Sequence, residues 1–386
     1  MSQATVSSLP LRSTDPVLIL GAGLMGRLLA VLLTQAGHPV RVLDAGGPDG
    51  QGSAAHVAAA MLAPLAESAI TEPSVVAMGQ YSLRRWPEVL ARLSQPVYFQ
   101  QNGTLILWHR QDAHEAQRFS NLLAATGRAL PDLPVPEALT APRLATLEPA
   151  LAQRFHQGLY LPEEGQLDNR QLLEALTATL DSQNVAIEWH TAWTDDMAVA
   201  HQRACGGWVL DCRGLGAQPD WKALRGVRGE VARLYAPDVT LQRPTRLLHP
   251  RYPIYIAPKQ DHVFVIGATE IEANDMSPAS VRSVLELLSA AYAVHPGFGE
   301  ARILELCTHC RPTLPDNLPA VREVAPQVLQ INGLYRHGFM ISPAIADAVL
   351  EHMHQGHTDL AGRLALRFDR ANEPVNERAH ASTTTA

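Results

Sequence analysis

The sequence predicts an α/β protein whose second part has α+β character. Three observations predict this. An apolar strand, a glycine turn and an apolar helix follow one another within residues 17–44. A second glycine turn follows another apolar strand at residues 208–217. A stretch that starts near residue 227 contains several short strand patterns, which is typical of an antiparallel sheet.

The first stretch contains each element of a βαβ unit. Residues 17–20 form an apolar run between turn residues, which is typical of a strand buried on both faces. Residues 24–36 are apolar almost all round, so we expect a buried helix that ends at Gly37. Residues 40–43 predict the second strand of the unit.

The glycines of this unit predict a dinucleotide site. Gly21 permits a tight turn, Gly23 lets a pyrophosphate approach the backbone, and Gly26 lets helix and strand pack closely. Asp44 ends the second strand, where a carboxylate can accept hydrogen bonds from a ribose diol. An ordinary glycine-rich turn would not explain the position of this acid. The predicted Rossmann-like contacts are Gly21, Gly23, Leu24, Met25, Gly26 and Asp44.

Composition narrows the class of protein. The chain has 386 residues, 46% of them apolar, so two domains or one large domain with a sizeable core are possible. A formal charge of -7 argues against nucleic acid or an anionic membrane as the main partner. No apolar run reaches the ~18 residues of a membrane-spanning helix. Residues 1–15 lack the apolar centre of a signal peptide and predict a flexible extension, so we expect a cytoplasmic protein.

The four cysteines are too few for a disulfide scaffold. Cys307 and Cys310 flank His309 in a Cys-x-x-Cys pattern, but no second pair completes a zinc site. We expect two packed thiols and no metal, and a bound metal is the less favoured interpretation.

The remaining pattern alternates helices and strands. Helices are expected at residues 53–65, 72–93, 112–126, 168–180, 278–294 and 342–355. Strands are expected at residues 97–99, 104–108, 158–161, 185–189, 208–212, 254–256, 263–266, 303–307 and 328–331, the last being the final strand. The helix at 53–65 is rich in small residues and follows the second strand, which favours a cofactor contact.

Several further motifs, with the first stretch, resemble the FAD-dependent D-amino-acid oxidase family, and most closely the glycine oxidases of thiamine biosynthesis. The motifs are Ala58-Ala59-Ala60-Met61-Leu62-Ala63-Pro64 with Glu67, Gln166-Leu167-Asp168, Val227-Arg228-Gly229-Glu230, Tyr255-Ile256-Ala257-Pro258, Gly267-Ala268-Thr269-Glu270, Arg311-Pro312 with Pro315-Asp316, and Tyr335-Arg336-His337-Gly338 through Ser342-Pro343-Ala344. They span nearly the whole chain.

The resemblance implies a discontinuous FAD-binding domain of the glutathione-reductase type and a substrate domain with an antiparallel sheet. The expected FAD-binding segments are 16–95, 142–222 and 308–370, and the expected substrate segments are 96–141 and 223–307. Residues 371–386 are expected to be a disordered tail.

The resemblance also implies the chemistry. Hydride passes from the substrate Cα to flavin N5, water hydrolyses the imine, and oxygen reoxidises the flavin. The protein then needs chiefly a cation for the substrate carboxylate, and the planar fork of arginine suits this role. Related sarcosine oxidases tether flavin through a cysteine. Cys310 lies one position from that spacing, so we expect FAD without a covalent bond.

The family positions imply the site residues. Arg311 is the expected carboxylate clamp, the Tyr255 hydroxyl is expected to bond the same carboxylate, and Arg336 is expected to line the site. Glu270 replaces a more usual apolar or small residue and is expected to meet the substrate amine or simply to end a strand. The further expected FAD contacts are Ala60, Met61, Leu62, Gly214, Gly216, His337, Gly338, Phe339 and Met340.

Three other departures from the family pattern affect these expectations. His56 stands where small hydroxyl residues are common, and Ala60 and Ala346 each replace a frequent glycine. We therefore leave the size of the substrate side chain open.

The expected partners are a small amino acid or amine and O2, and a homo-oligomer is possible. Three alternatives stay open: an FAD-dependent dehydrogenase that passes electrons to a quinone or a protein, a nicotinamide-dependent Rossmann enzyme, and a non-catalytic dinucleotide-binding protein.

Overall fold

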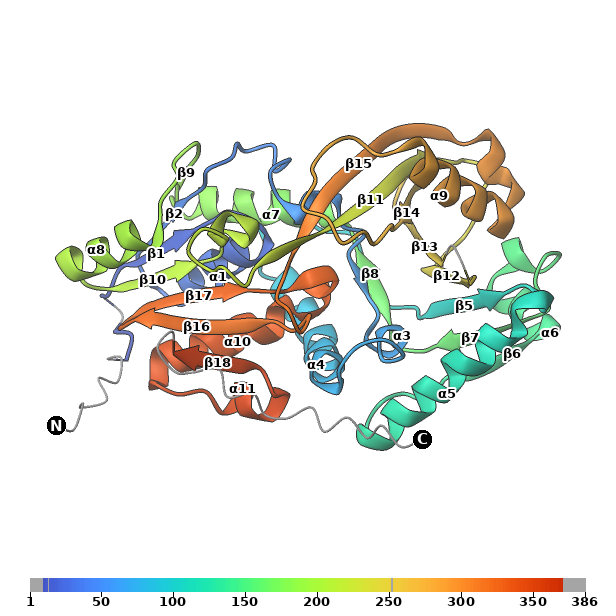
Figure 1. Ribbon diagram of the computed structural model, residues 1–386, viewed down its shortest axis with the longest axis horizontal. Coiled ribbons are helices and arrows are strands. Elements are labelled where there is room, and N and C mark those ends of the chain that lie inside the picture. Colours follow the sequence, from blue (N-terminus) through green and yellow to red (C-terminus); the bar gives the residue numbers. More distant parts are fainter. Residues whose placement is uncertain (1–9, 13, 251–252, 371–386) are drawn as a thin grey trace.

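The computed structural model describes residues 10–12, 14–250 and 253–370, and these residues form three sheets (Figure 1). In spatial order, the seven-stranded sheet contains β18 (Arg367–Arg370), β16 (Ala320–Ala325), β17 (Val328–Asn332), β10 (Trp208–Asp211), β1 (Val17–Leu20), β2 (Val40–Leu43) and β9 (Ile187–Glu188). The eight-stranded sheet contains β15 (Arg302–Thr313), β11 (Arg225–Tyr235), β14 (Val263–Gly267), β13 (Ile254–Pro258), β12 (Thr245–Leu248), β5 (Thr104–Trp108), β7 (Gln157–Leu161) and β6 (Glu137–Thr140). The three-stranded sheet contains β3 (Met61–Leu62), β8 (Gly165–Leu167) and β4 (Phe99–Gln100).

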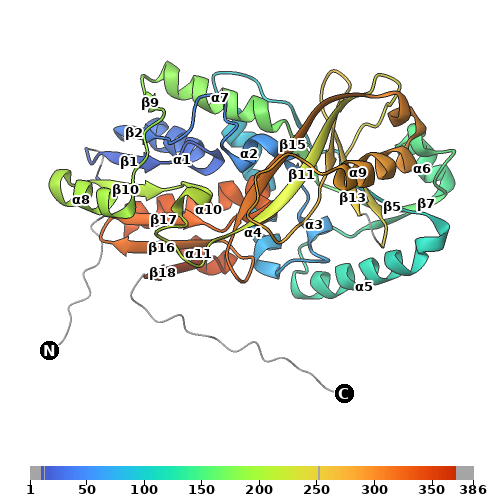
Figure 2. The same cartoon turned by 45° about the horizontal axis from the view of Figure 1, so that its top comes forward.

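The helices cover these sheets. They are α1 (Leu24–Gln35), α2 (Ala54–Val57), α3 (Pro64–Glu67), α4 (Pro73–Leu90), α5 (Ala113–Ala129), α6 (Ala141–Leu147), α7 (Asn169–Ser182), α8 (Asp195–Cys205), α9 (Val281–Val294), α10 (Gly338–Gln355) and α11 (Asp359–Leu364). As Figure 2 shows, α1, α7 and α10 lie with the seven-stranded sheet, whereas α5, α6 and α9 lie with the eight-stranded sheet. Among the described helices, none is long and apolar enough to cross a bilayer.

The strands β9, β2, β1, β10 and β17 run parallel to one another from one edge of the seven-stranded sheet, and β16 pairs antiparallel with β17. Val17 and Ile19 pack into the core beneath α1, α7 and α10, whereas Leu18 and Leu20 pack on the α8 side. All four residues of β1 are buried, so the predicted strand buried on both faces is confirmed. The carboxyl ends of these parallel strands meet at one edge, where open α/β sheets bind ligands.

The eight-stranded sheet is antiparallel except where β12 runs parallel to β5. A parallel sheet joined to an antiparallel one confirms the predicted fold class. The division into two domains remains our proposal, and strand pairing refines it. β7 pairs with β5 and β6, although residues 142–222 were grouped with the cofactor segments, and β15 runs unbroken through the proposed boundary at 307–308.

The prediction of one helix at 53–65 is wrong. α2 ends at Val57 because Ala58 is extended (ψ 149°) and Ala60 has a positive φ of 51°. The segment then forms the short strand β3 and the short helix α3. Alanine is the strongest helix former, so composition favoured a helix, and the tertiary contacts of the segment override this local preference. The left-handed backbone at Ala60 also explains why glycine is frequent at this position.

Other expectations need smaller corrections. The strands expected at 97–99 and 104–108 correspond to β4 and β5, which lie in different sheets. α11 and β18 follow the helix and strand that were expected to be the last. Leu11 is buried and its amide donates to the Met353 carbonyl (2.6 Å), so the end of the predicted extension is packed. The expected tail at 371–386 and residues 1–9 lie outside the described residues.

Candidate active site

A cavity of about 1130 Å³ lies where the two large sheets meet. The carboxyl ends of β1, β2 and β10 form one wall, and β11–β13 and β15 form the opposite wall. The lining contains Arg311, Tyr255, Arg336 and Glu270, together with all of the predicted cofactor contacts except Gly26 and Leu62. One cavity therefore brings together the two sets of residues that the sequence assigned to cofactor and substrate.

The two exceptions have packing roles. A Cβ atom on Gly26 would lie 1.8 Å from the Gly21 carbonyl oxygen, so only glycine permits this approach of helix to turn. Leu62 is fully buried in the core of the cofactor half instead of facing the cavity.

The first glycine turn is a cradle for a phosphate. Gly21 has a φ of 95°, which favours glycine, and Gly23 caps α1 without a side-chain hydrogen bond. The first amide groups of α1 are therefore free to bind an anion. The Asp44 carboxylate accepts hydrogen bonds from the amides of Ala22 and Gly46, which fixes it beside this turn.

Replacing Asp44 by alanine should increase the dissociation constant for FAD by roughly 10- to 100-fold, because hydrogen bonds to a charged group contribute about 1.5–3 kcal/mol. Flavin fluorescence after serial dilution of the holoenzyme measures this constant. Asp49→Ala, on the neighbouring exposed turn, is the control and should retain flavin normally. Equal flavin retention in both variants would refute the ribose contact.

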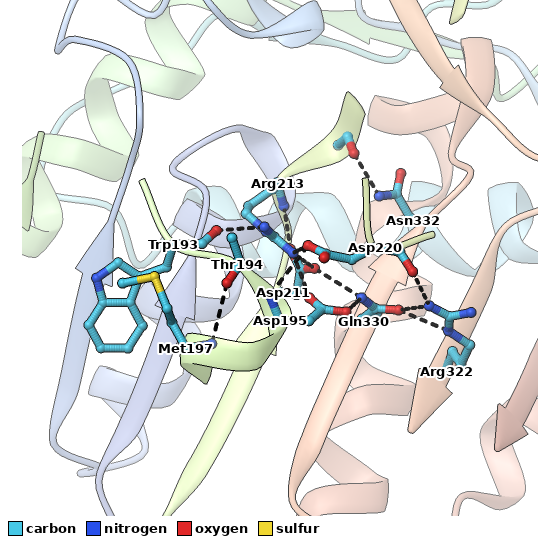
Figure 3. Close-up of polar contacts among 11 residues, drawn as sticks. Trp193, Thr194, Asp195, Met197, Asp211, Arg213, Asp220, Arg322, Gln330 and Asn332 are labelled. Atoms are coloured by element: carbon cyan, nitrogen blue, oxygen red, sulfur yellow. Dashed lines mark hydrogen bonds and ion pairs between the residues drawn. The ribbon is translucent and has the colours of Figure 1, made fainter. Parts of the chain in front are cut away.

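The second glycine turn is held by a partly buried ion cluster (Figure 3). Arg213 Nη2 lies 2.6 Å from Asp195 Oδ1, 2.7 Å from Asp211 Oδ2 and 3.0 Å from Asp220 Oδ2. Its Nη1 donates to the Trp193 carbonyl at 2.6 Å. Burial, reinforced by the charges of Asp211 and Asp220, raises the pKa of Asp195 to about 7. One guanidinium thus joins β10, the loop before α8 and the segment after the glycine turn.

This cluster positions cavity-lining backbone. Gly214, which starts η3 (Gly214–Ala217), has a φ of 56°, and its carbonyl accepts a hydrogen bond from Asn332 Nδ2 at 2.9 Å. Gly214 and Gly216 both line the cavity. Arg213 therefore acts on the cavity by holding the turn that follows it.

Arg311 occupies the opposite wall. Its guanidinium lies across Gly229, where a Cβ atom would come within 2.4 Å of Nη2. Its hydrogen bonds go to the carbonyls of Arg228 (3.3 Å) and Thr269 (3.1 Å). No carboxylate of the described residues lies within ion-pair distance of it. The charge of Arg311 is therefore oriented by neutral groups and remains available to an anionic ligand.

Tyr255 lies over Gly267, where a Cβ atom would meet the phenol oxygen at 2.4 Å. Burial raises the pKa of Tyr255, so its hydroxyl stays protonated and can donate a hydrogen bond. Glu270, unlike Tyr255, is ionised. Burial opposes its ionisation, but the Tyr335 hydroxyl and the Arg336 guanidinium outweigh burial and lower the pKa of Glu270. The wall thus offers a donor and a carboxylate beside the free guanidinium.

Arg336 is already engaged. Its guanidinium pairs with Glu67 Oε2 at 2.9 Å and with Glu270 Oε2 at 3.0 Å. Arg246 also pairs with Glu67, and together with Arg336 it overcomes burial and holds the pKa of Glu67 well below its usual range. Burial lowers the pKa of His337 to about 4, so this ring is neutral at pH 7. Arg336 therefore orders the wall through two carboxylates, unlike Arg311.

A buried acid lies behind this cluster and gives a pH prediction. Glu164 is 1% exposed, its Oε1 accepts the Ala66 amide at 2.7 Å, and burial raises its pKa to about 7. Between about pH 4.5 and 7 the unfolded chain ionises this acid but the folded protein does not, so stability falls as pH rises through this window.

Glu164→Gln should remove the loss of stability that Glu164 causes as the pH rises. Relative to wild type, the free energy of unfolding of the variant should be nearly equal at pH 5 and higher by roughly 3 kcal/mol at pH 8. Urea unfolding at both pH values measures the difference. Glu163→Gln, at the exposed neighbour, is the control. If the free energy of unfolding of the variant differed from wild type by the same amount at both pH values, Glu164 would not be a buried neutral carboxyl.

The departures from the family pattern lie in different places. The His56 carbonyl accepts a hydrogen bond from Asn169 (2.8 Å), Ala346 is fully buried in α10, and Ala60 lines the cavity.

The Cys310 thiol donates to the Asp275 carbonyl (3.4 Å), and the Cys307 thiol donates to Glu305 (3.1 Å). No group of three metal-binding side chains occurs among the described residues. Non-covalent flavin binding stays a prediction.

Sequence comparison identifies the class. Residues 16–352 match the family model described as DAO, FAD-dependent oxidoreductase, and the chain therefore belongs to this family. FAD is accordingly its cofactor, and the cavity fits it: the turn with free amides, the fixed carboxylate of Asp44 and the glycines at 214 and 216 line one continuous trough. The nicotinamide alternative is thereby set aside.

Two individual proteins show which members of this family the chain is similar to. The chain is 39% identical over 337 residues to the putative thiamine biosynthesis oxidoreductase ThiO of Rhizobium etli, covering 87% of this chain and 96% of that protein. It is 25% identical over 362 residues to the bifunctional protein ThiO/ThiG of Nostoc sp., covering 88% of this chain but 53% of that protein.

Solved structures confirm the fold. Glycine oxidase from Geobacillus kaustophilus superposes with a TM-score of 0.75 at 22% identity, covering 90% of this chain and 96% of that one. Iminodiacetate oxidase (IdaA) from Chelativorans sp. BNC1 gives a TM-score of 0.73 at 19% identity, covering 91% and 99%.

Sequence reasoning assigned no role to Arg246, Glu67 or Lys259. The Arg246–Glu67 pair joins residues 179 positions apart, and the ammonium of Lys259 bonds a carbonyl 200 positions away. Neither spacing has a local pattern. Lysine is almost never fully buried unless it is paired, so nothing in the sequence marked Lys259 as a buried residue.

Proposed function

We propose that this chain is a glycine oxidase-like flavoenzyme that oxidises a small amino acid or amine. The observation that carries the proposal is the Arg311 guanidinium, which has neutral partners and lines the cavity that also holds the dinucleotide cradle. Such a cation binds a substrate carboxylate through two parallel hydrogen bonds. Similarity to a thiamine biosynthesis oxidoreductase makes glycine the first candidate substrate.

The other residues of the wall complete the pocket. The Tyr255 hydroxyl donates a second type of hydrogen bond to the carboxylate, and the Glu270 carboxylate receives the amine at the far side. Arg336 holds Glu270 and Glu67 in place. Because Arg311 holds the substrate carboxylate and Glu270 holds the amine, the residues of this wall together orient the substrate Cα.

Bound FAD supplies the electron acceptor, with hydride leaving Cα for flavin N5 and O2 taking the electrons afterwards. The overall reaction consumes the amino acid, water and O2 and releases a 2-oxo acid, ammonia and H2O2. No residue needs to act as a base at Cα, because the Cα hydrogen leaves together with its bonding electron pair as hydride. The chain's own task is to bind the substrate, orient it and exclude competing water.

A peroxide assay in air tests this proposal. Glycine, sarcosine and a panel of D- and L-amino acids are supplied to the holoenzyme, and we expect H2O2 and ammonia to appear in equal amounts with at least one primary amine. Flavin that bleaches anaerobically without peroxide formation in air would indicate a dehydrogenase with another acceptor. Absence of bleaching with every amine would leave a flavin-binding protein without this activity.

A further inference from the structure

Lys259 is a buried lysine without a carboxylate partner among the described residues. Burial lowers its pKa to about 7, whereas the three oxygen acceptors around Nζ favour the charged ammonium. Lys259 directly follows β13 and is 7% exposed. Its Nζ donates to the Leu167 carbonyl at 2.7 Å, to the Ala59 carbonyl at 2.8 Å and to Gln166 Oε1 at 3.2 Å. All three acceptors are neutral. A buried ammonium costs several kcal/mol unless it is well bonded, so its three protons are matched by three oxygens.

The position of this ammonium alters a strand ladder. β3 pairs antiparallel with β8, with Met61 opposite Gln166, and the Leu167 amide donates to the Ala60 carbonyl at 3.1 Å. In a regular ladder the Ala60 amide would donate back to the Leu167 carbonyl. Among the described residues this carbonyl accepts from Lys259 Nζ, and Ala60, which has a φ of 51°, does not donate to it. The Ala60 amide consequently has no acceptor among the described residues.

Ala60 is also part of the cofactor cavity. Ala59, Ala60 and Met61 all line it. The Ala59 carbonyl, which accepts from Lys259, belongs to the same peptide group as the Ala60 amide. A hydrogen bond from a cation to the carbonyl polarises the peptide and strengthens its N–H as a donor. One lysine thus bonds both the carbonyl of this peptide group and the Leu167 carbonyl opposite Ala60.

We propose that Lys259 is a positioning residue that keeps the Ala60 amide free at the cavity wall as a donor to the bound FAD. It links β13 of the eight-stranded sheet to the cofactor-facing segment Ala59–Met61 and to β8. The charged side chains that surround it are Asp168, at the start of α7, and Arg233, on β11. Asp168 lies 4.0 Å from Arg233 and forms no ion pair with Lys259 among the described residues, and Arg233 is a like charge, so the three oxygens determine the orientation of the ammonium.

Lys259→Met tests the proposal, since methionine matches the length but lacks the charge. The holoenzyme variant should release FAD at least tenfold faster after dilution, and its visible flavin band should shift. Lys259→Arg should restore part of both properties, because it keeps a cationic donor. Lys222→Met, at an exposed lysine, is the control and should match wild type. Wild-type release and absorption in Lys259→Met would overturn the proposal.

A second measurement does not depend on how well the variant folds. Residue-resolved hydrogen exchange of the wild-type holoenzyme should show a strongly protected Ala60 amide, because the cofactor is its only acceptor. Rapid exchange of this amide would overturn the proposal. The experiment needs no amine substrate, so its outcome is separate from the proposed oxidase activity.

Discussion

Arg311→Ala should lose most amino-acid turnover while it retains FAD. Truncating one partner of a buried charged pair costs about 2–5 kcal/mol, which corresponds to a decrease in kcat/KM of roughly 30-fold to several-thousand-fold. The reason is structural. Among the described residues Arg311 bonds only the carbonyls of Arg228 and Thr269, so its removal breaks no ion pair there. The flavin cradle lies on the opposite wall and should stay intact.

Steady-state peroxide release measures this effect, and the flavin spectrum reports occupancy. Arg302→Ala, at the exposed start of the same strand, is the matched control and should be fully active. Arg311→Lys keeps the charge but loses the planar fork and should fall between the two. Unchanged kcat/KM in Arg311→Ala would remove the carboxylate clamp from the account.

Arg213→Ala should lower the free energy of unfolding by about 3–5 kcal/mol, because it leaves buried carboxylates without their cation. Asp211 is 1% exposed, and Asp195 and Asp220 approach the same guanidinium. The loss should be smaller at pH 5 than at pH 8, since protonation of Asp195 then relieves the repulsion. FAD affinity should fall in parallel because the glycine turn loses its anchor.

Urea unfolding at the two pH values measures the destabilisation. Arg203→Ala, at an exposed position of α8, is the control and should stay within about 0.5 kcal/mol of wild type. Equal stability of Arg213→Ala and wild type at pH 8 would contradict the cluster as the anchor of the turn.

Local patterns made much of the fold predictable. β1, the glycine turn, α1 and β2 are contiguous, and each glycine performs a conformational task that its neighbours in sequence reveal. The helix expected at 168–180 is α7, and Asp168 caps it by accepting from the amides of Arg170 and Gln171. Apart from Gly26 and Leu62, the predicted contacts of FAD and substrate line one cavity, because several motifs in the family order located them.

Long-range contacts limited the rest. The alanines at 53–65 favour a helix, but the segment leaves the helix at Ala58 and its Ala59 carbonyl bonds Lys259, which follows a strand of another sheet. Arg336 was expected at the substrate, but its pairing with Glu67 depends on how α3 and η5 (Tyr335–His337) come together. Contacts between residues so far apart in the sequence form only when both large sheets are assembled.

Anaerobic addition of glycine and other small amino acids to the purified holoenzyme, followed by visible absorption, tests the central claim most directly. The account predicts a yellow protein whose flavin bleaches with at least one small amino acid in wild type, and bleaches far more slowly in Arg311→Ala. A polypeptide that neither binds added FAD nor bleaches with any amino acid would contradict it.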